Sequence, residues 1–455
     1  MVEKRSSFTG KLGFVLAAAG SAVGLGNIWR FPYLAAEYGG GIFLLVYIIL
    51  ALTLGFSLMC AEIAIGRKTG KSAIEAFGSL NKKYSFIGWI ASIVPMLILP
   101  YYSVIGGWVI KYFYVFVSGG AAKSAADDYF GNFISSPIEP VGWLFLFMAL
   151  TAVIVLLGVD KGIEKLSKFA MPLLVFLTLV IAVYALTLDG AMEGVKYYLL
   201  PDFSKFSATT VLAAMGQLFY SMSIAMGIMI TYGSYMKKDV HLESSVKQIE
   251  VFDTGIAFLA GLMIIPAVFA FGGEKAIGKG AGLMFETLPK VFGEMTGGTI
   301  IGAIFFLLVF FAAITSSISL METVVSIISD KTKLKRRTTC LIVFLGSFAL
   351  GVPSALGNGK GPLSFISLGK LKILDIFDAL TNSIMMPIVA LLTCIFVGYV
   401  IKPKAIIEEI ELTKPFKMKS FFTIVIKYIA PICIILILGF SVYETIGNAL
   451  GIKTV

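Results

Sequence analysis

Long apolar runs recur along this chain, and each is long enough to cross a membrane as a helix. A helix needs about 20 residues to cross a hydrocarbon core of about 30 Å. Eleven runs meet this requirement, at 12–34, 41–66, 88–117, 141–158, 167–187, 207–235, 246–272, 298–328, 338–356, 375–401 and 421–446. Lipid offers the backbone no hydrogen-bond partners, and the runs lack the alternating pattern of barrel strands. We therefore predict an all-α, polytopic membrane protein with eleven transmembrane helices.

Composition excludes a water-soluble protein, because 58% of the residues are hydrophobic and only 14% are charged. The net charge of +10 does not indicate a nucleic-acid partner, since the basic residues lie in short connections and not along one folded face. The single histidine, His241, lies in a polar connection, and the four cysteines sit in or beside apolar runs without metal-binding spacing. We expect membrane lipid around the chain, and neither a zinc centre nor an enzyme.

The basic residues also indicate orientation, because cytoplasmic loops are enriched in lysine and arginine. If the N-terminus is cytoplasmic, 25 of the 37 basic residues fall on that side. An odd number of spans then places the C-terminus on the other side. The run LGFVLAAAGSA has features of a secretion signal, but its apolar stretch continues into a tryptophan, arginine and proline cluster. We expect a multi-pass protein of a prokaryotic inner membrane with its N-terminus in the cytoplasm.

Three glycines, Gly20, Gly24 and Gly26, interrupt the first span, and Pro32 follows them. Glycine costs a helix interior about 1 kcal/mol relative to alanine, so this helix is weak in its middle. Two interpretations fit this pattern. Either the helix breaks and its backbone lines a cavity, or the small residues allow close contact between helices.

The sixth span repeats this feature within GQLFYSMSIAMG, at residues 216–227. Two five-helix units that start at spans one and six would lie in opposite orientations, because each contains an odd number of helices. Paired broken helices in inverted halves indicate the binding site of a secondary transporter. We expect a first repeat at 1–187, a second at 188–401, and a cytoplasmic loop with the eleventh helix at 402–455.

Several polar residues stand at membrane depth. The hydroxyls of Thr315, Ser316 and Ser317 in the eighth span either bond carbonyls of their own helix or, with freed carbonyls of the first span, surround a sodium ion. Asp253 lies two turns inside the seventh span, where a carboxylate is costly unless it is paired or ligating. It is therefore either a functional residue or an acid at the membrane interface.

Charged residues near the ends of the spans suggest contacts that close the molecule. Arg30 ends the first span, and Asp375 and Asp378 open the tenth. A salt bridge between the arginine and one of these acids would act as an outer gate, unless it is an ordinary interfacial pair. Glu62 and Glu322 are interpreted as acids of a network on the cytoplasmic side.

The run AAAGSAVGLGNIWRFPYLAAEYGGGIF resembles the first helix and loop of the neurotransmitter:sodium symporters, which have the leucine-transporter fold. Further stretches similar to this family are Tyr101 with Tyr102, GQLFYSMS, FFAAITSS and ILDIFDAL, which are spread over the first ten spans. The resemblance implies a sodium-coupled symporter with a 5+5 inverted repeat and with helices one and six broken.

When the functional residues of the family are carried over to the matching positions of this chain, the resemblance implies two sodium sites, a substrate site and two gates. One sodium ion would bind Ala22, Asn27, Ser221 and Asp253, and the other Gly20, Val23, Ala312, Thr315 and Ser316. The substrate site would comprise Ala22, Gly24, Leu25, Gly26, Ile98, Tyr102, Tyr220, Ser221, Ser223, Met226, Ser316 and Leu320. The outer gate would be Arg30 with Asp378, and the inner gate Arg5 with Asp330 and Tyr235. Gly162 and Pro172 resemble the family's motif for unwinding the fifth helix.

Departures from the family pattern refine the expected function. Relatives that use amines place an aspartate where Gly24 stands, so the free space here implies a substrate that carries its own carboxylate. Asp253 replaces an asparagine that is common in the family, and its fixed charge implies independence from chloride. A twelfth span of many relatives is missing, which leaves the oligomeric state unknown.

We expect import of a neutral, hydrophobic or aromatic L-amino acid with sodium. The alternatives are a proton-coupled transporter and a non-transporting amino-acid sensor of the same fold.

Overall fold

The structure is a computed structural model that describes residues 6–272 and 282–450, and these are predominantly helical. The helices are α1 Lys11–Ala22, α2 Phe31–Glu37, α3 Gly41–Leu50, α4 Phe56–Thr69, α5 Ala73–Leu80, α6 Ser85–Val117, α7 Ala121–Ser124, α8 Tyr129–Ser135, α9 Glu139–Leu156, α10 Lys165–Leu186, α11 Ala191–Leu199, α12 Ala208–Ser221, α13 Ile228–Tyr235, α14 Leu242–Gly272, α15 Leu288–Glu294, α16 Gly298–Thr332, α17 Arg336–Leu356, α18 Ile373–Asp378, α19 Met386–Ile395, α20 Lys402–Ile410, α21 Lys419–Ile424 and α22 Ala430–Leu450.

Short π-helical and 3₁₀ segments connect or extend these helices. The π-helical segments are Gly26–Arg30, Ala51–Gly55, Val159–Glu164, Leu283–Thr287, Ala379–Met385, Phe396–Val400 and Val425–Ile429, and the 3₁₀ segments are Lys82–Tyr84 and Phe203–Lys205. Two short antiparallel strands, β1 Ser367–Leu368 and β2 Leu371–Lys372, form a hairpin.

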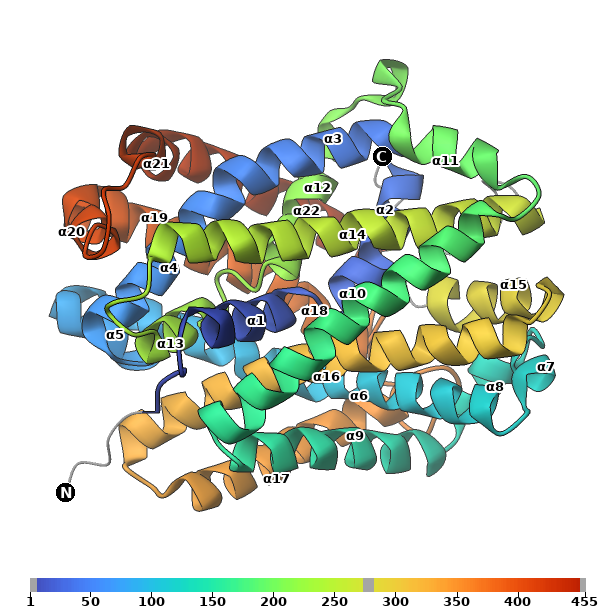
Figure 1. The fold of residues 1–455 in the computed structure, drawn as a ribbon. Helices are drawn as coiled ribbons and strands as arrows, with labels where there is room; N and C mark the ends of the chain where they lie inside the picture. Colours follow the sequence, from blue (N-terminus) through green and yellow to red (C-terminus); the bar gives the residue numbers. More distant parts are fainter. Residues whose placement is uncertain (1–5, 273–281, 451–455) are drawn as a thin grey trace.

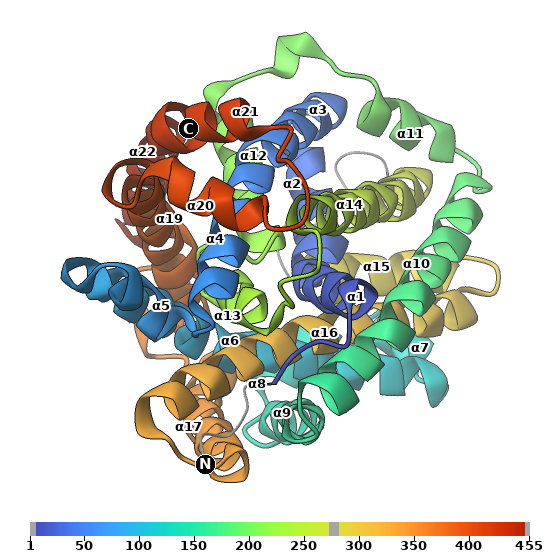
Figure 2. The same cartoon turned by 60° about the vertical axis from the view of Figure 1, so that its left-hand side comes forward.

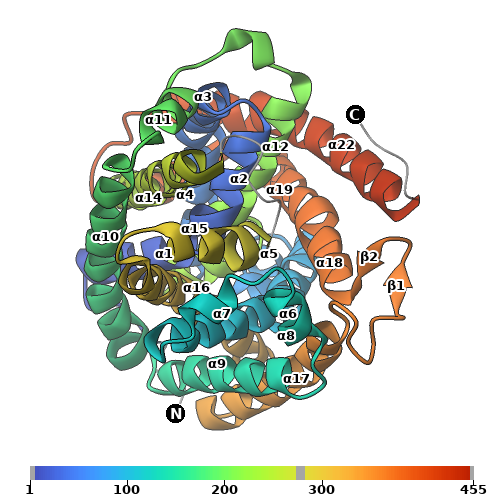
Figure 3. The same cartoon turned by 90° about the vertical axis from the view of Figure 1, so that its right-hand side faces the viewer.

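The long helices lie side by side, and short helices gather at the two ends of the bundle (Figure 1). One end carries α5, α20 and the connection between α13 and α14 (Figure 2). The other end carries α7, α8, α15 and the β1–β2 hairpin (Figure 3). Helix α1 lies in the interior between these ends, and its ten residues from Gly13 to Ala22 are all buried. Its alanines and glycines allow neighbouring helices to approach closely.

The structure confirms an all-α membrane protein, while the number of spans stays open. Within the described residues, nine helical segments are long and apolar enough to cross a membrane, and the bent pair Lys11–Ala22 and Gly26–Glu37 gives a tenth. The expected span at 207–235 is divided between α12 and α13, so it does not count as one long helix. The number eleven therefore remains a prediction.

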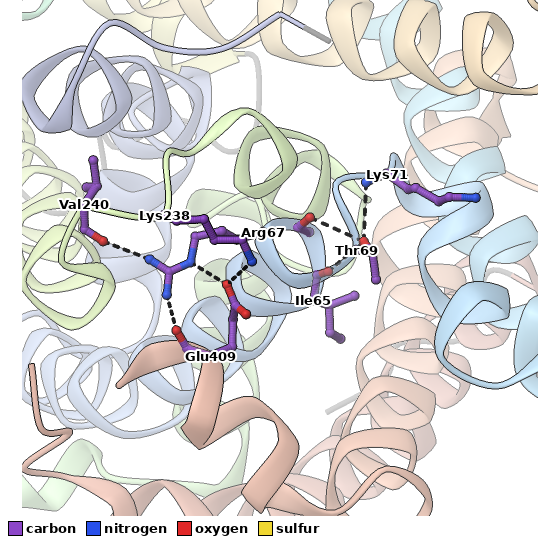
Figure 4. Close-up of polar contacts among 8 residues, drawn as sticks. Ile65, Arg67, Thr69, Lys71, Lys238, Val240 and Glu409 are labelled. Atoms are coloured by element: carbon purple, nitrogen blue, oxygen red, sulfur yellow. Dashed lines mark hydrogen bonds and ion pairs between the residues drawn. The ribbon is translucent and has the colours of Figure 1, made fainter. Parts of the chain in front are cut away.

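A buried arginine holds three segments together at the end that carries α20 (Figure 4). Arg67, in the last turn of α4, donates to Glu409 Oε1 of α20 over 2.9 Å and to the Val240 carbonyl over 2.8 Å. Lys238 Nζ donates to the same Glu409 oxygen over 2.8 Å. Because the Arg67 and Glu409 side chains are 0% and 5% exposed, loss of one would leave a buried charge unpaired, at a cost of about 3 to 5 kcal/mol. This arrangement fixes the connection 236–241 at the start of α14.

Candidate functional site

The first span breaks in the middle of the molecule. Between α1 and Gly26–Glu37 the axis bends by 52°. Val23 has an extended backbone, with φ −75° and ψ 97°, and the Gly24 amide donates to the Asn27 side chain over 3.1 Å. Carbonyl groups in the last turn of α1 are therefore available to partners outside the helix.

A second break separates α12 from α13. Ser223 and Ala225 have positive φ angles of 54° and 64°, and Gly227 has φ 72°. This conformation costs residues with side chains about 1 to 3 kcal/mol, so neighbouring groups must hold it in place. Glu62 Oε1 accepts from the Ala225 amide over 2.8 Å, and Ser223 Oγ donates to the Ser21 carbonyl over 3.0 Å. The two breaks thus contact each other, which confirms that the glycine-rich spans are broken.

A cavity lies between the two breaks and is completed by α6 and α16. All twelve residues of the expected substrate site line it, namely Ala22, Gly24, Leu25, Gly26, Ile98, Tyr102, Tyr220, Ser221, Ser223, Met226, Ser316 and Leu320. Ser21 and Ile228 line it too and were not predicted. The structure therefore brings the predicted residues together, and their role in binding stays a prediction.

The cavity combines hydroxyl and backbone groups with apolar side chains, as a zwitterion with an apolar side chain requires. The Leu25 amide donates to the Tyr102 hydroxyl over 3.4 Å. A Cβ atom added at Gly24 would lie 2.5 Å from Ser316 Oγ and 3.0 Å from Tyr102 Oη. The free space expected beside Gly24 is therefore closed in this conformation, because the hydroxyls of α6 and α16 occupy it.

Asp253 is completely buried and receives hydrogen bonds from three other helical segments. Asn27 Nδ2 donates to Asp253 Oδ1 over 2.8 Å, Ser221 Oγ donates to the same oxygen over 2.7 Å, and Tyr47 Oη donates to Oδ2 over 3.1 Å. Within the described ranges, no lysine or arginine forms an ion pair with this carboxylate. A buried carboxylate without a cationic neighbour is costly, so the site has the chemistry to hold a cation.

Tyr47 was missed because its neighbours in GIFLLVYIIL are almost all apolar. Its hydroxyl also lies 3.3 Å from Ser221 Oγ, so it joins the second broken span to Asp253. A tyrosine in the middle of a lipid-spanning run needs a buried partner for its hydroxyl. The tyrosine within this apolar run is therefore the sequence signal that could have identified Tyr47 as a buried hydrogen-bonding residue.

A second group of oxygen atoms lies where α16 passes the break in α1. Ser316 Oγ is 3.0 Å from the Ser21 carbonyl, 3.4 Å from that of Gly20 and 3.5 Å from that of Val23. Thr315 Oγ1 donates to the carbonyls of Phe311 and Ala312 in its own helix, at 2.9 and 3.2 Å. Thr315 thus adopts the intrahelical alternative, whereas Ser316 faces the broken helix.

Both groups fit sodium, because this hard cation prefers carbonyl, hydroxyl and carboxylate oxygens. The residues present would hold one ion beside Asp253 and another between α1 and α16. Among residues 6–272 and 282–450, no cluster of three or more histidine, cysteine, aspartate or glutamate side chains offers a site for a transition metal.

The expected outer gate is not a direct ion pair in this conformation. Asp378 Oδ1 accepts from Asn382 Nδ2 over 2.6 Å and from Tyr101 Oη over 3.3 Å. The Arg30 guanidinium lies over the Tyr220 ring, 5.1 Å from its centre, and its Nη1 has no hydrogen-bond partner in the described part of the chain. Asp375, the other candidate, accepts from the Lys372 amide over 3.1 Å at the start of α18.

The expected inner gate is only partly described, since Arg5 lies outside the described residues. Asp330 accepts from the amide and hydroxyl of Ser72 over 2.9 and 2.6 Å. Tyr235 Oη donates to Glu322 Oε1 over 2.8 Å.

A pair between Arg336 and Glu322 completes the contacts on the side of the inner gate. Arg336 was not predicted as a partner, because its position next to α16 depends on the fold. Gly162 lies in the π-helical segment Val159–Glu164 and Pro172 lies inside α10, so this region is helical in the present conformation.

Comparisons with known proteins match nearly the whole chain. Residues 5–122 and 132–451 match the model of the sodium:neurotransmitter symporter family. The chain is 35% identical over 446 residues to an uncharacterized sodium-dependent transporter of Bacillus subtilis, covering 96% of this chain and 97% of that protein. It is 34% identical over 469 residues to another of Methanocaldococcus jannaschii, covering 98% and 92%. The crystal structure of MhsT in complex with L-phenylalanine matches with a TM-score of 0.87 and 37% identity, covering 96% of this chain and 99% of that one.

Proposed function

This chain belongs to the sodium:neurotransmitter symporter family, and from this premise we propose that it imports a neutral, hydrophobic or aromatic L-amino acid together with sodium. Members of this family are membrane transporters, so the function is the movement of a solute and not the conversion of a substrate. The structural neighbour MhsT is described in complex with L-phenylalanine, which supports an aromatic amino acid as the first substrate to test.

The observation that carries the proposal is the unpaired charge of Asp253. Its carboxylate is 0% exposed and is surrounded by Asn27, Ser221 and Tyr47. A sodium ion there would supply the missing positive charge. The Ala22 carbonyl would be a further ligand from the broken first span, and Asn27 Oδ1 would become one when its amide group turns from the orientation that donates to Asp253.

The substrate would bind in the cavity between the two breaks. Its carboxylate would meet the amides of the first break and the Tyr102 hydroxyl, and it would also approach the sodium ion beside Asp253. Ile98, Met226 and Leu320 would surround the side chain. Because ion and substrate share contacts, each raises the affinity of the protein for the other, and this is the physical basis of coupling.

Transport then requires the cavity to open to one side at a time. Sodium binding would favour the state open to the outside, and the amino acid would close the side of Arg30 and Asp378. Release to the cytoplasm would follow separation of the contacts around Tyr235, Glu322 and Arg336, with the N-terminus and α20 on the cytoplasmic side. Chloride is not required in this scheme, because Asp253 carries a fixed negative charge.

Uptake of radiolabelled L-phenylalanine into proteoliposomes tests this function. We expect accumulation with external sodium and none when choline replaces it. Equal uptake with choline would exclude sodium coupling. Uptake that follows an imposed pH gradient at fixed sodium would favour the proton-coupled alternative, and tight binding without accumulation would favour a sensor.

A further inference from the structure

An open groove runs along the outer face of α14, opposite the side that carries Asp253. Val251, Gly255 and Phe258 of α14 form one wall, and Leu52 and Phe56 of the second span form the other. Leu52 and Val251 are 57% and 71% exposed, so the groove faces the surroundings of the bundle and not its interior.

The groove has the length of one membrane leaflet. From Lys247 to Phe258 it follows α14 over eleven steps between residues, which corresponds to about 16 Å at 1.5 Å per residue. Half of a hydrocarbon core is about 15 Å thick. The headgroup and ester region of a phospholipid would therefore lie beside Lys247 to Thr254, and the first part of one acyl chain beside Gly255 and Phe258.

A basic mouth, defined as Lys247, Lys414 and Lys417, lies at the end of the groove near α20. These lysines line a second hollow, and Lys247 lines both this hollow and the groove. Lys247 Nζ is paired with Glu243 over 2.7 Å. In the described part of the chain, neither Lys414 nor Lys417 has an acidic partner. The mouth thus retains positive charge where the apolar groove begins.

Two polar atoms inside the groove also lack partners within residues 6–272 and 282–450. Glu250 is 4% exposed, and its Oε1 has no hydrogen-bond partner. Thr254 Oγ1, one turn further along α14, has none either. A hydrocarbon tail alone would leave the Thr254 hydroxyl unsatisfied, whereas the ester groups of a phospholipid, which lie directly below its phosphate, supply acceptors. The Thr254 hydroxyl can donate to an ester carbonyl there.

We propose that this groove binds one anionic glycerophospholipid, with its phosphate at the basic mouth and one acyl chain between α14 and the second span. The two walls are also the elements that bring Tyr47 and Asp253 within 3.1 Å of each other. A lipid that fills the groove would therefore hold α14 and the second span together and so stabilise the proposed cation site. The effect of the lipid on the cation site rests on the proposed function, whereas the binding of the lipid to the groove does not.

Native mass spectrometry of the purified full chain tests the proposal directly. Phosphatidylglycerol and phosphatidylcholine with identical acyl chains are titrated separately, and glycerol 3-phosphate is titrated as a headgroup without tails. We expect the first phosphatidylglycerol to bind at least 10-fold more tightly than phosphatidylcholine. Equal affinity of the two lipids would overturn the proposal. Equally tight binding of glycerol 3-phosphate would also overturn it, because the site would then bind a soluble anion.

Two variants separate headgroup from tail. Lys414→Gln with Lys417→Gln should weaken phosphatidylglycerol binding about 25-fold, since each lysine near an anionic headgroup contributes about 5-fold. Gly255→Phe should abolish the preference by filling the groove, because a Cβ at Gly255 has no atom within 4 Å. Leu52→Trp fills it from the other wall if the first variant does not fold.

The matched controls change the same residue types elsewhere. Gly346 of α17 also has open space around an added Cβ, so Gly346→Phe should keep the lipid preference. Lys82→Gln with Lys83→Gln should keep it as well. Retention of the preference in both groove-filling variants would show that the tail does not lie between α14 and the second span. A preference lost equally in the controls would contradict a specific site.

Discussion

Asn27 of the broken first span donates through Nδ2 to Asp253 Oδ1 over 2.8 Å and so joins the middle of that span to the middle of α14. The same amide carries Oδ1, which accepts from the Gly24 amide over 3.1 Å. One side chain therefore connects the backbone of the cavity with the Asp253 carboxylate, beside which we propose the first cation site. Changes at Asp253 should reach the substrate through this contact.

Replacement of Asp253 by asparagine removes this charge while it keeps the size of the side chain. We expect sodium affinity to fall by about 10- to 100-fold, since contacts to a charged group contribute about 1.5 to 3 kcal/mol. External chloride should restore part of the uptake, because it would replace the lost negative charge. Sodium titrations of uptake in proteoliposomes, with chloride or gluconate as the anion, measure both effects. Unchanged sodium affinity would exclude Asp253 as a ligand.

Tyr47→Phe removes the hydroxyl that donates to Asp253 Oδ2. We expect weaker sodium binding by about 10-fold, from the loss of one hydrogen bond to a charged acceptor. Tyr112→Phe is the matched control, because its hydroxyl donates to the Phe285 carbonyl over 2.8 Å, away from the cavity. A titration of sodium-dependent thermal stabilisation compares the two. Equal losses would indicate general destabilisation and not a role at the ion site.

Gly24→Ala places a Cβ 2.5 Å from Ser316 Oγ and should abolish amino-acid binding. Gly216→Ala is the control, because a Cβ added at Gly216 of the second broken span has open space around it. Scintillation proximity binding of labelled L-phenylalanine distinguishes them. Wild-type affinity in Gly24→Ala would show that this backbone does not contact the substrate.

Glu62→Leu removes the acceptor for the Ala225 amide in the second break, and we expect transport to fall at least 10-fold. Glu62→Gln keeps an oxygen in the same place and should retain most of the activity. A loss of the same size in both variants would mean that the charge of Glu62, and not its hydrogen bond to the break, is what transport requires.

His241 gives a prediction on pH, because it lies in the connection before α14 and outside the spans. Burial lowers the pKa of His241 from its usual value of 6.5, and Lys414, Lys11 and Lys247 lower it further, while Glu243 has the opposite effect. The unfolded chain therefore binds this proton more readily than the folded chain. The free energy of unfolding should fall as the pH drops through about 6.5. Thermal unfolding at pH 7.5 and 5.5 should show a smaller fall in His241→Asn than in the wild type, and equal falls would contradict this assignment.

The sequence predicted those parts of the site that depend on a local pattern of residues. Glycines in an apolar run indicate a weak helix but fit close helix packing as well as a break, and the family resemblance then implied both breaks and supplied the cavity residues. Tyr47 could not be placed, because its partners Ser221 and Asp253 lie far away in the sequence and only packing of the helices brings them together. Arg336 lies 14 residues from Glu322, and their pairing depends on how α17 turns back along α16. The relation of Arg30 to Asp378 depends on the conformation of the cavity, which no pattern of residues encodes.

The most direct test is to measure the coupling between sodium and amino acid in both directions. Equilibrium binding of labelled L-phenylalanine is recorded over a range of sodium concentrations, and binding of labelled sodium over a range of L-phenylalanine concentrations. If the two share the site between the broken spans, each must raise the affinity for the other by the same factor. We predict equal factors, which Asp253→Asn reduces together. Amino-acid binding that does not change when choline replaces sodium would contradict the account.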